Sequence, residues 1–223
     1  MPKEHRWLPV LAPLLPLAAV PEPVAMGVPG EGYPFAWSVY RWIDGEPASA
    51  EAVADPVALG VEVGGFLRAL AAVDTRGGPT PGPHNFNRGG PLAFYEEETL
   101  QAVEMLGDRI PREAVLEIWT DAVAAEWHGE PVWFHGDVAE GNLLLRDGRL
   151  AAVIDFGTCG VGDPACDTVI AWTLLRGEAR AAFRSALGAD DATWARGRGW
   201  ALWKALITYD DAASRATLAE LVA

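Results

Sequence analysis

The stretch His135-Gly136-Asp137-Val138-Ala139-Glu140-Gly141-Asn142, followed by Ile154-Asp155-Phe156-Gly157, contains the polar groups that decide the fold. Phosphoryl transfer needs a base for the acceptor hydroxyl and two oxygen ligands for the metal ion that bridges the phosphates. Asp137, Asn142 and Asp155 are side chains of these types. The two motifs together therefore favour phosphoryl-transfer chemistry, provided that the chain brings them to one point.

The segments around the two motifs predict short buried strands. We expect strands at 132–134, 142–146 and 150–154, because these runs are apolar and bounded by turn residues. Asp147-Gly148 is the two-residue turn that most strongly indicates a β-hairpin between the last two strands. The hairpin would bring the ends of the two motifs together.

The expected hairpin register gives the separation of the candidate metal ligands. A two-residue turn pairs Arg146 with Arg149, which sets Asn142 opposite Val153 and Glu140 opposite Asp155. Asn142 and Asp155 would then lie on neighbouring strands within roughly 8 Å of each other, a separation that one metal ion can bridge. Asp137, on the connecting loop, would face the same point and could accept the proton of a substrate hydroxyl.

These motifs resemble those of the aminoglycoside phosphotransferase family, small-molecule kinases with the protein-kinase fold. Besides the two motifs, 162–167 (Gly-Asp-Pro-Ala-Cys-Asp) matches the family pattern, 37–42 resembles the strand that enters the hinge between the lobes, and 82–90 resembles a loop of some bacterial members. The resemblance implies an α+β, protein-kinase-like fold that is mostly the helical C-terminal lobe with a catalytic β-hairpin. Residues 1–42 would be a remnant of the N-terminal β-lobe and hinge, and 43–223 the phosphotransferase lobe.

The resemblance also implies roles for individual residues. Asp137 would be the catalytic base, and Asn142 and Asp155 the Mg²⁺ ligands. His135, Gly157 and Asp167 would support the two loops, which we call the catalytic loop (135–142) and the metal loop (154–157). Tyr40, Arg41, Trp42 and Ile43 would contact the nucleotide at the hinge, although Trp42 could instead pack in the core. His84 and Glu140 are candidate acceptor contacts, with a structural loop histidine and a solvated glutamate as the alternatives.

The lysine that kinases of this fold place over the nucleotide phosphates is not found in the sequence. The only lysines are Lys3, before any strand, and Lys204, in a late helical stretch. Glu4 matches the helix glutamate that would pair with this lysine. We therefore expect the sequence to align with the family pattern from just after the strand that carries the lysine. Gly30-Glu31-Gly32 is not followed by a helix, so we expect a turn between strands there and not a phosphate cradle.

Composition narrows the possible partners. The chain has 223 residues, half of them hydrophobic, and a net charge of −14, which argues against nucleic acid and anionic membranes as partners. Its acidity fits a cationic acceptor such as an aminoglycoside. The two cysteines form no disulfide framework and indicate a reducing, cytoplasmic compartment. The apolar stretch 8–20 is interrupted by prolines and is too short to cross a bilayer.

Helical segments are expected in the second half of the chain. Apolar periodicity predicts helices over 111–129 and 194–213. Asp163 and Pro164 fit the cap and first position of another helix, which would run to about Arg176 and be closed by Gly177.

The sequence thus predicts an ATP- or GTP-dependent phosphotransferase that uses Mg²⁺ and moves the γ-phosphoryl group to a hydroxyl of an aminoglycoside-like molecule or a metabolite. The alternative is an N-terminally truncated, catalytically silent binding fragment of such a kinase. A metal-dependent phosphoesterase is disfavoured because a two-metal site needs further ligands. The sequence leaves open the acceptor, the choice between ATP and GTP, and the oligomeric state.

Overall fold

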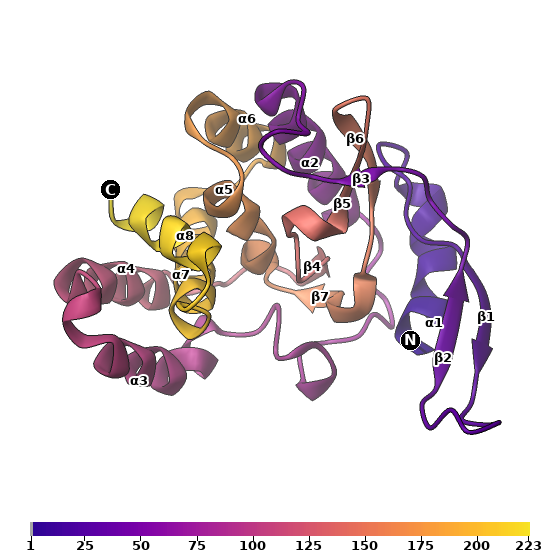
Figure 1. Cartoon of the computed structure of the whole chain (residues 1–223), viewed down its shortest axis with the longest axis horizontal. Coiled ribbons are helices and arrows are strands. Elements are labelled where there is room, and N and C mark those ends of the chain that lie inside the picture. The colour runs from indigo at the N-terminus through magenta and orange to yellow at the C-terminus, as the bar shows by residue number, and fades with distance from the viewer. Residues whose placement is uncertain (1) are drawn as a thin grey trace.

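The computed structural model describes residues 2–223 and has an α+β fold with three small sheets. Figure 1 shows the N-terminal segments along one side of the molecule, the catalytic strands in the middle and the C-terminal helices on the opposite side. One hydrophobic cluster extends from Trp7 to Leu221 and includes buried side chains of both the N-terminal helix and the last helix. Among residues 2–223, no helix is long and apolar enough to cross a membrane.

The N-terminal segment consists of a helix and a two-stranded ribbon. Helix α1 (Pro2–Leu11) is followed by strands β1 (Pro23–Gly27) and β2 (Trp37–Tyr40), which pair antiparallel. Between the strands, Gly30 and Tyr33 exchange backbone hydrogen bonds of 3.1 and 2.9 Å. The segment 30–32 is therefore a turn between strands, as the sequence predicted.

The catalytic hairpin is formed by β5 (Leu143–Arg146) and β6 (Arg149–Val153), with β3 (Glu46–Pro47) paired to the other edge of β5. Asp147 and Gly148 have φ of 52° and 73°. Both residues are thus left-handed, as this type of hairpin turn requires. The predicted hairpin is confirmed.

The expected register is wrong beyond the middle of the hairpin. Arg146 pairs with Arg149 as predicted, but Leu143, and not Asn142, lies opposite Val153, because a bulge interrupts the register between Leu144 and Leu145. The extra residue is Ala151, whose carbonyl accepts a hydrogen bond from the Ala19 amide at 2.9 Å. Asn142 therefore ends a 3₁₀ turn, Glu140–Asn142, and precedes the strand. β6 likewise ends one residue earlier than predicted, at Val153.

A second strand pair carries the catalytic loop. β4 (Val132–Phe134), predicted from the sequence, pairs antiparallel with β7 (Gly160–Gly162), so that Trp133 lies opposite Val161. The catalytic loop leaves the end of β4, and the chain that follows the metal loop enters β7 beside it. This pairing brings the two motifs together independently of the hairpin.

Helix α2 (Pro56–Ala71) packs closely against α6 (Gly177–Leu187). Two glycines of α2 permit this approach: a Cβ at Gly60 would lie 2.4 Å from the Ala179 carbonyl oxygen, and one at Gly64 would lie 2.7 Å from that of Phe183. Asp55 begins α2 by accepting hydrogen bonds from the amides of Val57 and Ala58.

The helices of the second half differ from the sequence predictions at their ends. The observed helices are α3 (Glu96–Leu106), α4 (Arg112–Ala124), α5 (Ile170–Thr173), α7 (Asp191–Ile207) and α8 (Ala212–Val222). The segment after Asp163 is a 3₁₀ helix, Pro164–Val169, that continues into the single turn of α5. Gly177 does not close that helix but begins α6, with a φ of 50°. The predicted helix 194–213 is divided into α7 and α8 by a turn at 208–211.

Candidate active site

His135 joins the catalytic loop to the metal loop. Its ring is fully buried, Nε2 donates to the carbonyl of Ile154 at 2.9 Å, and Nδ1 accepts from the amide of Asp137 at 3.2 Å. These contacts require the neutral tautomer with the proton on Nε2. Burial lowers the pKa of His135, which agrees with the neutral form. The ring therefore fixes the positions of the two motifs relative to each other.

Asp167 holds the backbone of the catalytic loop. Its carboxylate accepts hydrogen bonds from the amides of His135 (2.7 Å) and Gly136 (2.6 Å), and it is buried. Burial raises the pKa of Asp167 to about 7, against the opposite effect of these two hydrogen bonds. Its position on the 3₁₀ helix after β7 thus couples that segment to the catalytic loop.

Gly136 occupies a position that only glycine fits. Its φ is 89°, and a Cβ there would lie 2.8 Å from the carbonyl oxygen of Thr158. Its own carbonyl accepts a hydrogen bond from Arg88 Nε at 3.1 Å. The tight turn at Gly136 directs the next side chain, Asp137, away from the core.

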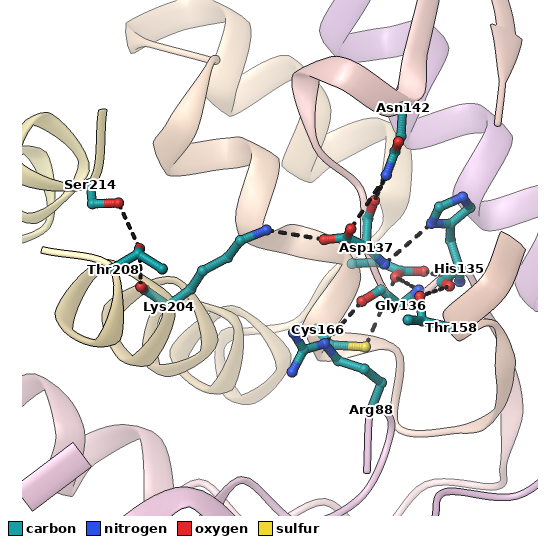
Figure 2. Close-up of polar contacts among 11 residues, drawn as sticks. Arg88, His135, Gly136, Asp137, Asn142, Thr158, Cys166, Lys204, Thr208 and Ser214 are labelled. Atoms are coloured by element: carbon teal, nitrogen blue, oxygen red, sulfur yellow. Dashed lines mark hydrogen bonds and ion pairs between the residues drawn. The ribbon is translucent and has the colours of Figure 1, made fainter. Parts of the chain in front are cut away.

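Asp137 has a different partner on each carboxylate oxygen (Figure 2). Oδ1 accepts from Lys204 Nζ at 3.0 Å, whereas the side-chain amide of Asn142 lies 3.4 Å from Oδ2 and 2.9 Å from the Asp137 carbonyl. The side chains of Asp137 and Lys204 are 36% and 40% exposed. The carboxylate is thus fixed by its neighbours and still open to solvent.

The two predicted metal ligands, Asn142 and Asp155, lie on neighbouring segments of the folded chain. The Ile154 amide donates to the backbone carbonyl of Asn142 at 2.9 Å, which places Asp155 next to Asn142. Asp155 is exposed and left-handed, with φ of 62°, and its Oδ1 accepts from the Gly157 amide at 3.3 Å. A left-handed aspartate is an uncommon conformation that here turns the carboxylate outward.

These residues fit a magnesium ion in donor chemistry and number. Mg²⁺ is bound in nucleotide sites by one or two protein carboxylates together with substrate phosphates and water. The Asn142 amide nitrogen faces Asp137, which leaves its side-chain oxygen as the atom that a metal ion would bind. Residues 2–223 contain no group of three or more His, Cys, Asp or Glu placed to hold a metal ion alone.

The predicted nucleotide residues occupy the N-terminal side of the site. The Tyr40 hydroxyl donates to Glu4 Oε2 at 3.0 Å, and Glu4 is buried. Burial raises the pKa of Tyr40, and the nearby charges of Glu4 and Asp155 raise it further. Arg41 forms an exposed ion pair with Glu22.

Trp42 and Ile43 continue the hinge segment after β2. Trp42 is 85% exposed, so the alternative that it packs in the core is wrong; its Nε1 donates to Asp44 Oδ1 at 3.0 Å. Ile43 is half-buried. The aromatic face of Trp42 is therefore accessible to a ligand.

The two candidate acceptor residues lie in different places. His84 is exposed, donates through Nε2 to the Thr80 carbonyl at 2.9 Å and lies 3.4 Å from Lys3 Nζ, which in turn donates to the Cys159 carbonyl at 2.8 Å. It is thus near the segment after the metal loop. Glu140 is half-buried and lines a cavity together with Lys204.

Sequence reasoning missed the contacts of three cations, two beside Asp137 and one at Asp163. Lys204 was assigned only to a late helix, and Arg88 and Arg196 were given no role. Arg88 reaches the catalytic loop, and Arg196 forms a buried, two-point ion pair with Asp163 at 2.7 and 3.0 Å. The Asp163-Pro164 pattern signalled the helix start, and Asp163 does accept from the Ala165 amide at 3.1 Å. Its pairing with a residue of α7 has no local sequence signal.

The fold belongs to the class of phosphotransferases with a kinase-like fold. Residues 1–200 match the family model described as "APH: Phosphotransferase enzyme family". The chain belongs to this phosphotransferase family. Comparison with curated protein sequences found no match.

Solved structures of antibiotic phosphotransferases share the fold. The GDP complex of a variant of aminoglycoside 2′-phosphotransferase-IIIa aligns with a TM-score of 0.69 at 20% identity, over 98% of this chain and 78% of that chain. The GDP and kanamycin complex of APH(2″)-IIIa gives a TM-score of 0.63 at 19% identity, over 99% and 80%. Macrolide 2′-phosphotransferase MphH from Brachybacterium faecium gives 0.55 at 23% identity, over 98% and 77%. At these identities the likeness concerns the fold alone.

Proposed function

We propose that the chain is a nucleotide-dependent phosphotransferase that moves the γ-phosphoryl group of ATP or GTP to a hydroxyl of a small molecule. The observation that carries this proposal is the position of Asp137. Its carboxylate is fixed between Lys204 and Asn142, and its loop is braced by His135 and Asp167. A fixed, solvent-accessible carboxylate next to two oxygen ligands is the arrangement that phosphoryl transfer requires.

Each residue of the site has a role in this proposal. Asn142 and Asp155 would hold Mg²⁺, which when bound neutralises the charge of the phosphates. Asp137 orients the acceptor hydroxyl and accepts its proton as the bond to phosphorus forms. Trp42 and the backbone around Arg41 and Ile43 hold the base of the nucleotide at the hinge.

The comparisons support a nucleotide as the phosphoryl donor and do not distinguish ATP from GTP. Structures with this fold include complexes with GDP, with ADP and with ATP. Both ATP and GTP are therefore donors to test. The reaction takes place in a reducing, cytoplasmic compartment, in keeping with two free, buried cysteines.

A second candidate function is nucleotide or acceptor binding without transfer. It is favoured by the positions of the two lysines. The two lysines contact the Cys159 carbonyl and Asp137 in the part of the chain that the structure describes, positions 2–223. A chain that holds nucleotide without a phosphate-contacting lysine would bind it but transfer the phosphoryl group poorly.

Turnover by Asp137→Asn separates the two candidates. Nucleotide consumption is measured with water or with a panel of polyol, amino-sugar and hydroxy-acid acceptors. The rate for Asp137→Asn should be about 10²- to 10⁴-fold lower than the rate for the wild type, the range for loss of a general base. Nucleotide affinity should change little, because Asp137 lies on the acceptor side of the metal ligands. Equal turnover by the variant would refute the role of Asp137, and wild-type binding without any turnover would favour the silent protein.

A further inference from the structure

A cavity of about 210 Å³ adjoins the catalytic loop, between that loop and helices α5, α7 and α8. Its apolar lining consists of small side chains. The polar side chains that line it are those of Glu140, Thr173, Lys204, Thr208, Ser214 and Thr217. The hydroxyl of Thr173 is buried and has no hydrogen-bond partner among residues 2–223.

The cavity lies beside Asp137: the next residues of the loop, Val138 to Glu140, line it, although Asp137 itself does not. Asn142 and Asp155 do not line it, whereas Lys204 does. Figure 2 shows that Lys204 and Asn142 approach the Asp137 carboxylate from different directions. Since the nucleotide phosphates must lie at the metal ligands, a hydroxyl that attacks in line reaches Asp137 from the other side, where the cavity is.

A second cation is held next to Lys204. The guanidinium of Arg88 lies 4.7 Å from the ring centroid of Trp203 and 5.0 Å from that of Trp200. Its Nη1 is buried without a hydrogen-bond partner in the described part of the chain, and Arg88, Asp137 and Lys204 line one small pocket. Two positive groups thus meet beside the carboxylate that acts on the acceptor.

The ion pair between Lys204 and Asp137 leaves hydrogens on the ammonium for an acceptor. Lys204 Nζ has three hydrogens, and one of them is donated to Asp137 Oδ1 at 3.0 Å. When Asp137 takes the proton of the acceptor hydroxyl, its carboxylate loses its charge, and an anionic group on the acceptor would then supply the counter-charge for Lys204. A polycationic acceptor would add positive charge beside Lys204, with Glu140 as the carboxylate that lines the cavity.

We propose that this cavity binds a small hydroxyl-bearing acceptor through an oxyanion, a carboxylate or a phosphate ester, that pairs with Lys204. The cavity is smaller than the roughly 300–1,000 Å³ of pockets for drug-sized ligands, which also favours a small metabolite over an aminoglycoside. The transfer to this acceptor and the role of its anion beside Asp137 rest on the proposed function, whereas the binding of an anion by Lys204 can be measured independently of transfer.

Anion binding is tested by calorimetry of the full chain with inorganic phosphate and, separately, with glycerate. Lys204→Met should weaken the binding of at least one anion by about 10-fold or more, and Lys204→Arg should retain most of it. The matched control is Arg112→Met, which removes an exposed cation paired with Glu104 away from the site. Tighter binding of phosphate than of glycerate would identify the anionic group of the acceptor as a phosphate ester. Tighter binding of glycerate would identify it as a carboxylate. Equal affinities of wild type and Lys204→Met, or no binding of either anion, would overturn the proposal.

Nucleotide titrations of the same variants test whether Lys204 contacts the acceptor or the nucleotide. We expect Lys204→Met to bind ATP and GTP as the wild type does. A loss of triphosphate affinity with unchanged diphosphate affinity would place Lys204 at the γ-phosphoryl group and overturn the acceptor assignment. Lys204-dependent anion binding by a chain that binds no nucleotide would mean that the proposed function fails while the anion site stands.

Discussion

The buried ion pair between Asp163 and Arg196 gives a stability prediction that can be worked out from the structure. Both residues are 4% exposed, Nε and Nη2 of Arg196 contact the two carboxylate oxygens at 2.7 and 3.0 Å, and Nη1 donates to the Ala125 carbonyl at 3.1 Å. Arg196→Met keeps most of the side-chain volume and leaves the Asp163 carboxylate and the Ala125 carbonyl without these donors.

The expected cost of Arg196→Met is about 3–5 kcal/mol, the range for removing one partner of a buried ion pair. Asp163 retains the Ala165 amide as a donor, which limits the cost, whereas the unpaired Ala125 carbonyl adds about 1 kcal/mol or more. This is a large share of the ~5–15 kcal/mol by which a domain is stable.

Urea unfolding followed by tryptophan fluorescence measures the free energy of unfolding of this variant. The control Arg112→Met removes a half-exposed cation and should cost less than about 1 kcal/mol. The double variant with Asp163→Asn should be less destabilised than the sum of the two single variants, because both remove the same interaction. A loss below about 1 kcal/mol for Arg196→Met would refute the reasoning.

Two further predictions concern the catalytic loop. Burial raises the pKa of Asp167 to about 7, so the folded chain retains a proton that the unfolded chain releases near pH 4. The stabilisation that this proton gives to the folded chain is full below pH 4 and is lost as the pH rises through 7. Urea midpoints between pH 5 and 8 should therefore fall more steeply in the wild type than in Asp167→Asn, and parallel slopes would contradict this assignment. Asp137→Asn should change the free energy of unfolding by less than about 1 kcal/mol, since its ion pair with Lys204 is more than one-third exposed; a loss above about 2 kcal/mol in the same urea assay would show that Asp137 is structural.

The local features of the catalytic segment could be predicted from the sequence. Asp147-Gly148 adopts the left-handed pair that its composition indicates, and the strands on either side follow from apolar runs between turn residues. The bulge at Ala151 could not be predicted, because it depends on a hydrogen bond with Ala19, which is distant in sequence. The register error moved Asn142 from a strand to a turn but left it next to Asp155.

The contacts of the cations could not be predicted for the same reason. Lys204 reaches Asp137, Arg196 reaches Asp163 and Arg88 reaches Gly136 only through tertiary packing of helices and loops. A helical pattern predicts which residues share a face, but it does not identify the loop that this face meets. By contrast, the division of 194–213 into α7 and α8 has a local signal, because the turn at 208–211 is Thr-Tyr-Asp-Asp and the residue that precedes α8 is Asp211, a preferred cap type.

Nucleotide binding tests the central claim most directly. The measurement is calorimetry of the 223-residue chain with non-hydrolysable analogues of ATP and GTP in the presence of Mg²⁺, with Asp155→Ala as the variant that removes the proposed metal ligand. The account predicts micromolar binding of at least one analogue that depends on Mg²⁺ and disappears in Asp155→Ala. A folded chain that binds neither analogue, or binds equally well without Asp155, would contradict the account.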